Sequence, residues 1–192
     1  MFKKKYFILF VVIFVVSVVF FACAQNATLN NPNEIIDFLL NIHSPRNFTS
    51  GHISDEKIHQ ILLAGHQTGS ARNAQPWHFT VVRNHNLINE IMRREIAQDN
   101  VLIIVSGARE PSIVYFDCAL ATQSMFLAAQ ALGLGARMFM VPLPNLNENL
   151  LYRLEAPEGH VAHMILLIGY LDDAITTASP RHPLDTRVNF IE

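Results

Sequence analysis

The chain of 192 residues has few of the residue types that mark several common protein classes. It has two cysteines, and only Cys118 lies in the body of the chain, so the sequence predicts neither an internal disulfide nor a cysteine-based metal site. The formal net charge of −2 gives no basic surface for nucleic acid. A Gly-x-Ser-x-Gly segment is also missing, which argues against a hydrolase with a nucleophile elbow.

The nine histidines do not form a convincing set of metal ligands. His160 and His163 lie close together at the entrance of a predicted strand, where residues three apart point to opposite faces. The acidic residue beside them is Glu158. The sequence therefore predicts no metal site.

One long apolar run lies at the N-terminus. Lys3–Lys5 precede Tyr6–Ala24, a run of 19 residues without charge. A secretory signal peptide and an uncleaved membrane-spanning helix both fit this pattern, and a buried core helix is a third interpretation. In the first two cases the lysines stay in the cytoplasm and the remainder is exported. We therefore expect residues 1–24 to be a signal peptide or membrane anchor and residues 25–192 to be one domain.

The way in which this segment ends leaves the localisation open. Ala22-Cys23-Ala24 fits the small-x-small site of a signal peptidase, which would release a chain beginning at Gln25. Phe20-Phe21-Ala22-Cys23 resembles a loose bacterial lipobox, in which Cys23 would be lipidated. Since twin arginines are missing, we expect export of an unfolded chain without a preloaded cofactor. The product would be periplasmic, or anchored to the membrane on its outer side.

Hydrophobic periodicity and capping residues predict alternating helices and strands. Helices are expected to begin at Asn31–Glu34 and at Ser54–Glu56, to cover Leu87–Ile96 and Val114–Leu134, and to follow a capping pair of Asn145 and Glu148. Strands are expected over His78–Val82, Val101–Val105, Ala136–Val141 and Ala162–Leu171. This order predicts an α+β three-layer sandwich, with a mixed central sheet flanked by helices.

A polar segment joins the second predicted helix to the first predicted strand. It reads Ser70-Ala71-Arg72-Asn73-Ala74-Gln75-Pro76-Trp77-His78-Phe79 and combines hydroxyl, guanidinium and amide groups. This segment resembles the flavin-contacting turn of the FMN-dependent nitroreductase family. The resemblance implies that Asn73 and Gln75 approach the flavin and that Ser70 and Arg72 contribute beside them. We interpret Trp77 as a core residue.

Two further segments resemble the family's phosphate-binding residues. His43-Ser44-Pro45-Arg46-Asn47-Phe48 is similar to its basic-Ser-x-basic-x-Phe motif, which implies that His43, Ser44 and Arg46 hold the FMN phosphate and ribityl chain. Guanidinium groups suit this task because they bind phosphate through paired, charge-assisted hydrogen bonds. Ile42 departs from the arginine usual at that position. Arg181, which follows the Gly169-Tyr170 pair, matches a later arginine that returns to the phosphate.

A third resemblance concerns Gly133-Leu134-Gly135 and the strand predicted after it. In the family, the backbone of that strand passes the isoalloxazine, which implies that Met138, Phe139 or Met140 lies nearest to the ring. A helix-ending glycine pair followed by core methionines is the alternative interpretation.

As a whole, the resemblance implies an FMN-dependent oxidoreductase that acts as a homodimer, with each flavin site at the subunit interface. Electrons would pass from NAD(P)H or another donor to an electron-poor acceptor such as a nitroaromatic or a quinone. The side chains would hold the cofactor, and none is predicted to be catalytic. An exported domain meets little NAD(P)H, so a flavin-binding or small-ligand-binding domain without turnover is the alternative. A membrane-anchored interaction protein without a cofactor is a third hypothesis.

Overall fold

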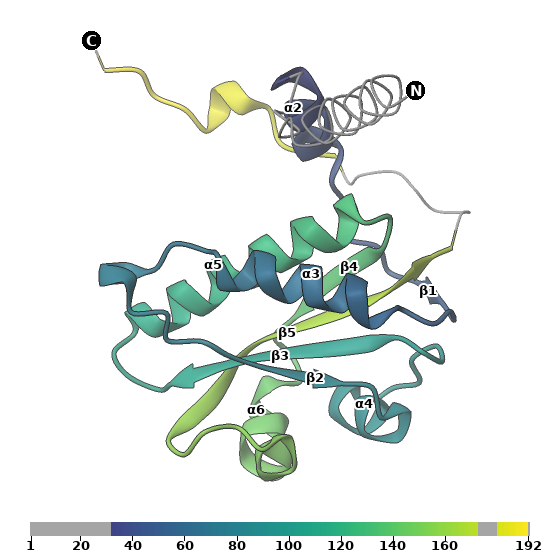
Figure 1. Ribbon diagram of the computed structural model, residues 1–192. Coiled ribbons are helices and arrows are strands. Elements are labelled where there is room, and N and C mark those ends of the chain that lie inside the picture. The colour runs from purple at the N-terminus through teal and green to yellow at the C-terminus, as the bar shows by residue number, and fades with distance from the viewer. Residues whose placement is uncertain (1–31, 173–179, 192) are drawn as a thin grey trace, which may run out of the picture. The chain divides into compact units, whose positions relative to one another are not determined.

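The computed structural model describes residues 32–172 and 180–191 (Figure 1). Contacts divide the chain into two units, Met1–Asn41 and Ile42–Glu192. The described part of the first unit contains helix α2 (Pro32–Asn41), as the sequence predicts. The predicted signal or anchor, including Cys23, lies outside the described residues. Within the described ranges, no helix is both long enough and apolar enough to cross a bilayer.

The second unit is built on a five-stranded sheet. Its strands are β1 (Phe48–Thr49), β2 (His78–Val82), β3 (Val101–Ala108), β4 (Gly135–Phe139) and β5 (His160–Leu171). They follow the order β1-β5-β3-β2, and β4 also pairs with β5. The pairings found in the described residues are all antiparallel, whereas the sequence predicted a mixed sheet. The long β5 is the centre of the unit because it pairs with three other strands.

Helices cover both faces of this sheet, so the predicted three-layer α+β sandwich is confirmed (Figure 1). Helices α3 (Asp55–His66) and α5 (Ile113–Ala131) lie on one face. Helix α4 (His85–Met92) and the short α6 (Leu143–Asn145) lie on the other, and helical turns over Leu146–Leu150 and Leu151–Leu154 follow α6. Val101–Val105 are buried, as expected for a strand covered on both faces.

Local sequence explains where the helices begin and end. The Ser54 hydroxyl accepts a hydrogen bond from Lys57 N, 3.3 Å away, and caps α3. The side-chain oxygen of Asn84 accepts from Leu87 N at 3.0 Å and caps α4. Helix α4 ends at Arg93, which has a left-handed φ of 53°, and therefore stops short of the predicted Ile96.

The short helical stretch predicted before Pro157 is present, as α6 and the turns Leu146–Leu150 and Leu151–Leu154, but it begins earlier than predicted, at Leu143. Asn145 stands before the turn Leu146–Leu150 but makes no side-chain capping bond, and its Oδ1 accepts a hydrogen bond from Asn149 Nδ2. Pro142 and Pro144 explain the shift, since prolines are tolerated in the first turn of a helix and start this one earlier.

Close packing brings α3 against α5. Gly65 faces Met125, and a Cβ atom at position 65 would lie 2.6 Å from Met125 Cγ. Glycine therefore sets the distance between these helices. Trp77 is buried in the same core and stacks on Phe79 with ring centroids 6.4 Å apart, which confirms its interpretation as a core residue.

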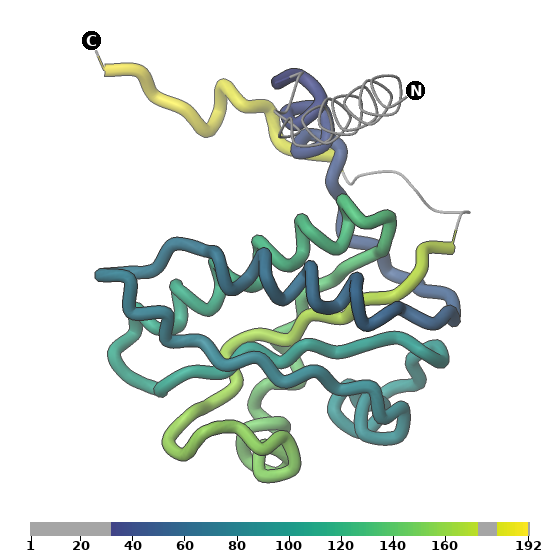
Figure 2. The backbone as a smooth tube through the Cα atoms, in the orientation of Figure 1, coloured from purple at the N-terminus to yellow at the C-terminus, as the bar shows by residue number. Residues whose placement is uncertain are grey.

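Figure 2 traces the two segments that approach the ends of α5. The loop between α3 and β2 meets the beginning of α5, whereas the segment before β1 meets its end. The fold thus uses α5 as the common support for two of the segments singled out by their sequence.

Candidate functional site

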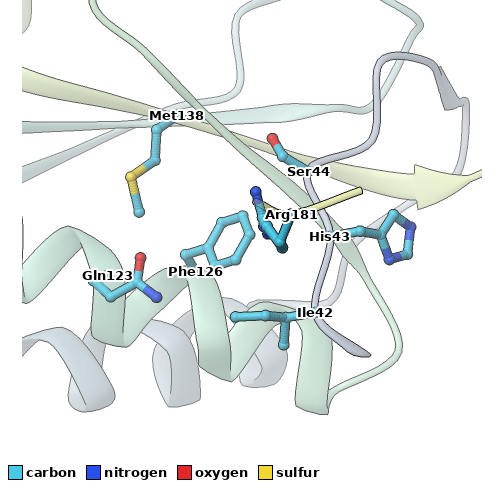
Figure 3. A pocket seen from close by; sticks show the side chains of 7 residues that line it. All are labelled: Ile42, His43, Ser44, Gln123, Phe126, Met138 and Arg181. Atoms are coloured by element: carbon cyan, nitrogen blue, oxygen red, sulfur yellow. The ribbon is translucent and has the colours of Figure 1, made fainter. Parts of the chain in front are cut away.

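A cavity of about 280 Å³ lies along the second half of α5, and we call it the Ser44 cavity (Figure 3). It is lined by Ile42, His43, Ser44, Gln123, Phe126, Met138 and Arg181. Four of these were predicted from the sequence as cofactor-binding residues: His43, Ser44, Met138 and Arg181. The lining therefore comes from four segments that are far apart in the chain.

The backbone of His43 is tied to the last turn of α5. Gln130 Nε2 donates to the His43 carbonyl at 2.9 Å, and His43 N donates to Gln130 Oε1 at 3.3 Å. Nε2 of the imidazole is buried and has no hydrogen-bond partner among the described residues. An unpaired buried polar atom is costly, and Figure 3 shows the His43 ring pointing away from Met138, Phe126 and Arg181, so the ring is not turned into the cavity.

The lining combines apolar and polar groups. Figure 3 shows Met138 extending toward Gln123, and Arg181 beside Phe126. Gln123 and Phe126 were not predicted as site residues. Neither belongs to a motif of the sequence, and Gln123 is one of several polar residues of α5.

Three predicted residues that neighbour these four in sequence lie outside the Ser44 cavity: Arg46, Phe139 and Met140. The Arg46 side chain is exposed. Phe139 packs in the other core, since neighbouring side chains of a strand point to opposite faces. Its ring lies between two guanidinium groups, with Arg94 Cζ at 5.3 Å and Arg137 Cζ at 5.2 Å from the centroid. Met140 is 52% exposed, and its sulfur accepts a weak hydrogen bond from the Tyr115 hydroxyl at 4.0 Å.

The predicted flavin-contacting segment forms a strained turn, Ser70–Gln75, called the polar turn below. Three of its residues have left-handed backbones although none is glycine: Arg72 (φ 56°), Asn73 (φ 55°) and Gln75 (φ 46°). Such conformations cost on the order of 1–3 kcal/mol each and concentrate at functional sites. The side chains of all three residues are exposed.

Hydrogen bonds within the polar turn fix its shape. The Ser70 hydroxyl accepts from Gln75 N at 2.9 Å, and Gln75 Nε2 donates to Asn73 Oδ1 at 3.2 Å. The Ser70 side chain therefore closes the turn. At the exit from the turn, Gly107 of β3 packs closely, because a Cβ there would lie 3.0 Å from the carbonyl oxygen of Pro76.

The polar turn and the Ser44 cavity lie at opposite ends of α5. Ala71 N donates to Asp117 Oδ1 at 3.1 Å, whereas His43 bonds to Gln130. These two helix positions are 13 residues apart, or about 20 Å along the axis at 1.5 Å per residue. Within one chain, the two groups of predicted residues are therefore attached to different parts of α5.

A histidine cluster lies at the same end of the sheet as the polar turn. The rings of His78 and His160 are 6.3 Å apart, and His163 packs against Tyr115 at 5.9 Å. Burial lowers the pKa of His160, with smaller contributions from the charges of His78 and His163. No group of three His, Cys, Asp or Glu side chains suited to a metal ion occurs in the part of the chain that the structure describes.

The single cysteine of the body is inert. Cys118 is fully buried, and burial raises the pKa of its thiol to about 12, with a further contribution from the charge of Asp117. A thiol with so high a pKa does not ionise near neutral pH, and the thiolate is the reactive form.

The fold and the partly polar Ser44 cavity define an α+β domain of the kind that binds a small molecule. Comparison with known proteins then identifies the chain as a member of the nitroreductase family. A protein of Methanothermobacter thermautotrophicus named "Putative NADH dehydrogenase/NAD(P)H nitroreductase" is 30% identical over 147 residues, which cover 71% of this chain and 77% of that protein. The profile of the nitroreductase family matches residues 41–98. An Archaeoglobus fulgidus protein of the same name is 29% identical over 153 residues, covering 73% and 87% of the two chains.

Solved structures agree with this assignment. A Desulfitobacterium hafniense nitroreductase with bound FMN has a TM-score of 0.71 and 25% identity, over 84% of this chain and all of its own. A Bacteroides fragilis nitroreductase with bound FMN has a TM-score of 0.73 and 23% identity, over 83% of this chain and all of its own. The nitroreductase fold predicted from the sequence is confirmed.

Proposed function

We propose that this protein is an FMN-dependent oxidoreductase. It passes electrons from NAD(P)H or another donor to an electron-poor acceptor such as a nitroaromatic or a quinone. Membership of the nitroreductase family and the likeness to an FMN-bound nitroreductase support this function. The observation that carries it in this chain is the Ser44 cavity, which gathers the Ser44 hydroxyl, the Gln123 amide and the Arg181 guanidinium from distant segments.

The residues of the Ser44 cavity fit the phosphate and ribityl part of FMN. A phosphate needs positive charge and several hydrogen-bond donors, which Arg181 and Ser44 supply. Apolar lining from Ile42, Phe126 and Met138 suits the less polar remainder of the ligand. When bound, FMN would supply the electron-transfer chemistry, and these side chains would bind and orient it.

The size and position of the Ser44 cavity support a homodimer with shared sites. Its volume of about 280 Å³ is slightly below the range of about 300–1,000 Å³ found for small-molecule pockets. The polar turn, with Asn73 and Gln75, is not part of the cavity lining and bonds to α5 at Asp117, six residues or about 9 Å along the axis before Gln123 of the lining. A second copy of the chain could place its own polar turn beside the cavity and complete the site.

Helix α5 offers a surface for that second copy. Ile113, Phe116 and Leu120 are 44%, 58% and 53% exposed, and we call them the α5 stripe. Their spacing places them on one face of the helix. Exposed apolar side chains in a row are typical of a protein interface, so we assign the α5 stripe to contact between the two copies.

Reconstitution with FMN tests this function. The full chain is mixed with FMN, excess ligand is removed, and an absorbance spectrum is recorded under anaerobic conditions before and after addition of NADH or NADPH. We expect a flavin band at about 450 nm that the nicotinamide bleaches and an added quinone restores. Failure to retain FMN would contradict the proposal.

The alternative is a flavin-binding domain without turnover. The observation behind it is the predicted export signal, since NAD(P)H is scarce outside the cytoplasm. Retained FMN that is reduced by dithionite but by neither nicotinamide would favour a different electron donor. Reoxidation by a quinone then separates the two functions, because a domain without turnover does not pass its electrons to the acceptor.

We also propose that residues 1–24 direct export and that the domain then remains anchored or becomes periplasmic. The supporting feature is the apolar run Tyr6–Ala24 behind Lys3–Lys5. Labelling cells with a radioactive fatty acid, with and without Cys23→Ser, separates the outcomes. Label that disappears in the variant supports lipidation. An unlabelled chain beginning at Gln25 supports cleavage, and an unlabelled full-length chain in the membrane fraction supports a retained anchor.

A further inference from the structure

We propose that Asp117 is a positioning residue for the cofactor site. It acts through the backbone of Ala71 to hold the polar turn in the strained shape that presents Asn73 and Gln75. This inference rests on the proposed FMN function, because the polar turn gains its role from the cofactor. Asp117 was not among the residues that the sequence predicted for the site.

The first observation is the isolation of the polar turn. Its other hydrogen bonds are internal, from Asn73 N to Ser70 O, from Gln75 N to the Ser70 hydroxyl and from Gln75 Nε2 to Asn73. Among the described residues, the bond from Ala71 N to Asp117 Oδ1 is the only hydrogen bond that joins the turn to another element. Removal of this bond therefore leaves the internal bonds intact but frees the turn from α5.

The second observation is the burial of Asp117. The residue is 3% exposed, although an ionised carboxylate is costly to remove from water. A bond from a backbone N–H to a carboxylate is charge-assisted, and this makes it stronger than a bond between neutral groups. The chain thus places a strong acceptor where a neutral side chain would suffice to fill the core.

The third observation is the strain that this anchor opposes. Arg72, Asn73 and Gln75 all have positive φ, a conformation that a free turn of non-glycine residues leaves readily. Ala71 immediately precedes this strained series. A fixed point at Ala71, together with the Ser70–Gln75 clamp, restrains the turn from both sides.

Two variants separate the hydrogen bond from the charge. Asp117→Ala removes the acceptor, whereas Asp117→Asn keeps an oxygen at the same place. Thr122→Val is the matched control, because Thr122 is also buried in α5 and its hydroxyl donates to Cys118 O at 2.7 Å, away from the polar turn. The three variants therefore perturb one helix but only one of them frees the turn.

The first readout is tryptic cleavage of the full chain without FMN. Cleavage after Arg72, in the polar turn, is compared by mass spectrometry with cleavage after Arg93. We expect Asp117→Ala to accelerate cleavage after Arg72 about tenfold and to leave Arg93 unchanged, because proteolysis follows the population of the open form. We expect Asp117→Asn and Thr122→Val to stay within about threefold of the original chain.

The second readout is FMN affinity, measured by quenching of flavin fluorescence. We expect Asp117→Ala to weaken binding about tenfold, Asp117→Asn to restore it to within about threefold, and Thr122→Val to leave it unchanged. Unchanged cleavage after Arg72 in Asp117→Ala, or equal acceleration in Thr122→Val, would overturn the positioning role. So would a freed turn with unaltered FMN affinity. If the original chain binds no FMN, the proposed function fails, whereas the cleavage comparison still tests the anchor.

Discussion

The two ends of α5 present their polar groups in opposite ways. At its C-terminal end, two hydrogen bonds between Gln130 and the backbone of His43 hold this residue beside the Ser44 cavity, which Ser44 and Arg181 also line. At its N-terminal end, the polar turn exposes its side chains on a strained backbone. The C-terminal end of α5 thus supports the Ser44 cavity, whereas its N-terminal end supports the exposed polar turn.

This difference explains why the chain keeps a strained turn on its surface. The polar turn contributes no residue to the Ser44 cavity of its own chain, so its strained shape does not build that cavity within one copy. The strain becomes useful if the turn of one copy completes the cavity of another. Preorganised donors bind a ligand more tightly because less ordering is needed on binding.

The largest effect should come from separating the two copies of the proposed homodimer. We predict that Phe116→Asp with Leu120→Asp, in the α5 stripe, yields a monomer and weakens FMN binding more than about 100-fold. Light scattering gives the mass, and flavin fluorescence gives the affinity. Tyr152→Asp is the control, since Tyr152 is 81% exposed but lies beyond α5. A monomeric variant that retains FMN would show that one chain suffices.

The next prediction tests the Ser44 cavity alone. Arg181 lines the Ser44 cavity, whereas Arg46 is exposed outside it, although the sequence assigned both to the phosphate. We predict that Arg181→Ala weakens FMN binding about tenfold to 100-fold and that Arg46→Ala changes it less than about threefold. Titration with FMN measures both, and the double variant should match Arg181→Ala. Equal losses in the single variants would place Arg46 on the ligand after all.

Local signals in the sequence were enough to predict most of the fold. The Ser54 cap and the apolar run Val101–Val105 each determine their element through neighbours in sequence, and the structure confirms both. The end of α4 and the start of the last helical stretch differ from the prediction because each depends on backbone geometry, at Arg93 and at Pro142. Side-chain types at those positions do not report that geometry.

The candidate site could be predicted only as a set of residues. The motifs around Ser44 and Asn73 supplied its members, but their separation by α5 depends on how helices pack, which no single motif encodes. Gln123 and Asp117 carry no motif and became visible only through the cavity and the bond to Ala71. Tertiary contacts of this kind are beyond the reach of one sequence.

A smaller effect tests the backbone strain of the polar turn. We predict that Gln75→Gly raises the free energy of unfolding by about 1 kcal/mol, because glycine adopts positive φ without strain, and weakens FMN binding about tenfold through loss of the amide. Ala74→Gly is the control: Ala74 has a φ of −71°, so glycine there relieves nothing and destabilises. Urea unfolding and FMN titration measure the two quantities. A Gln75→Gly chain that is less stable would contradict the strain.

The smallest effect concerns pH and should appear only at the end of the sheet near the polar turn. Burial, and then the charges of His78 and His163, lower the pKa of His160 in the folded chain from 6.5. At a pH between the pKa of folded His160 and about 6.5, the unfolded chain therefore binds more protons than the folded chain. The contribution of His160 to stability is complete above about pH 6.5 and is lost as the pH falls toward its folded pKa. We predict that His160→Gln flattens the pH dependence of urea unfolding between about pH 7.5 and pH 5.5. Hydrogen exchange should show the acid-induced opening at Gly107 and Val161, which pair across β3 and β5, and not at His43. Equal opening at both ends of α5 would contradict the prediction. It would mean that the two ends open as one cooperative unit and that protonation of the histidine cluster has no local effect near the polar turn.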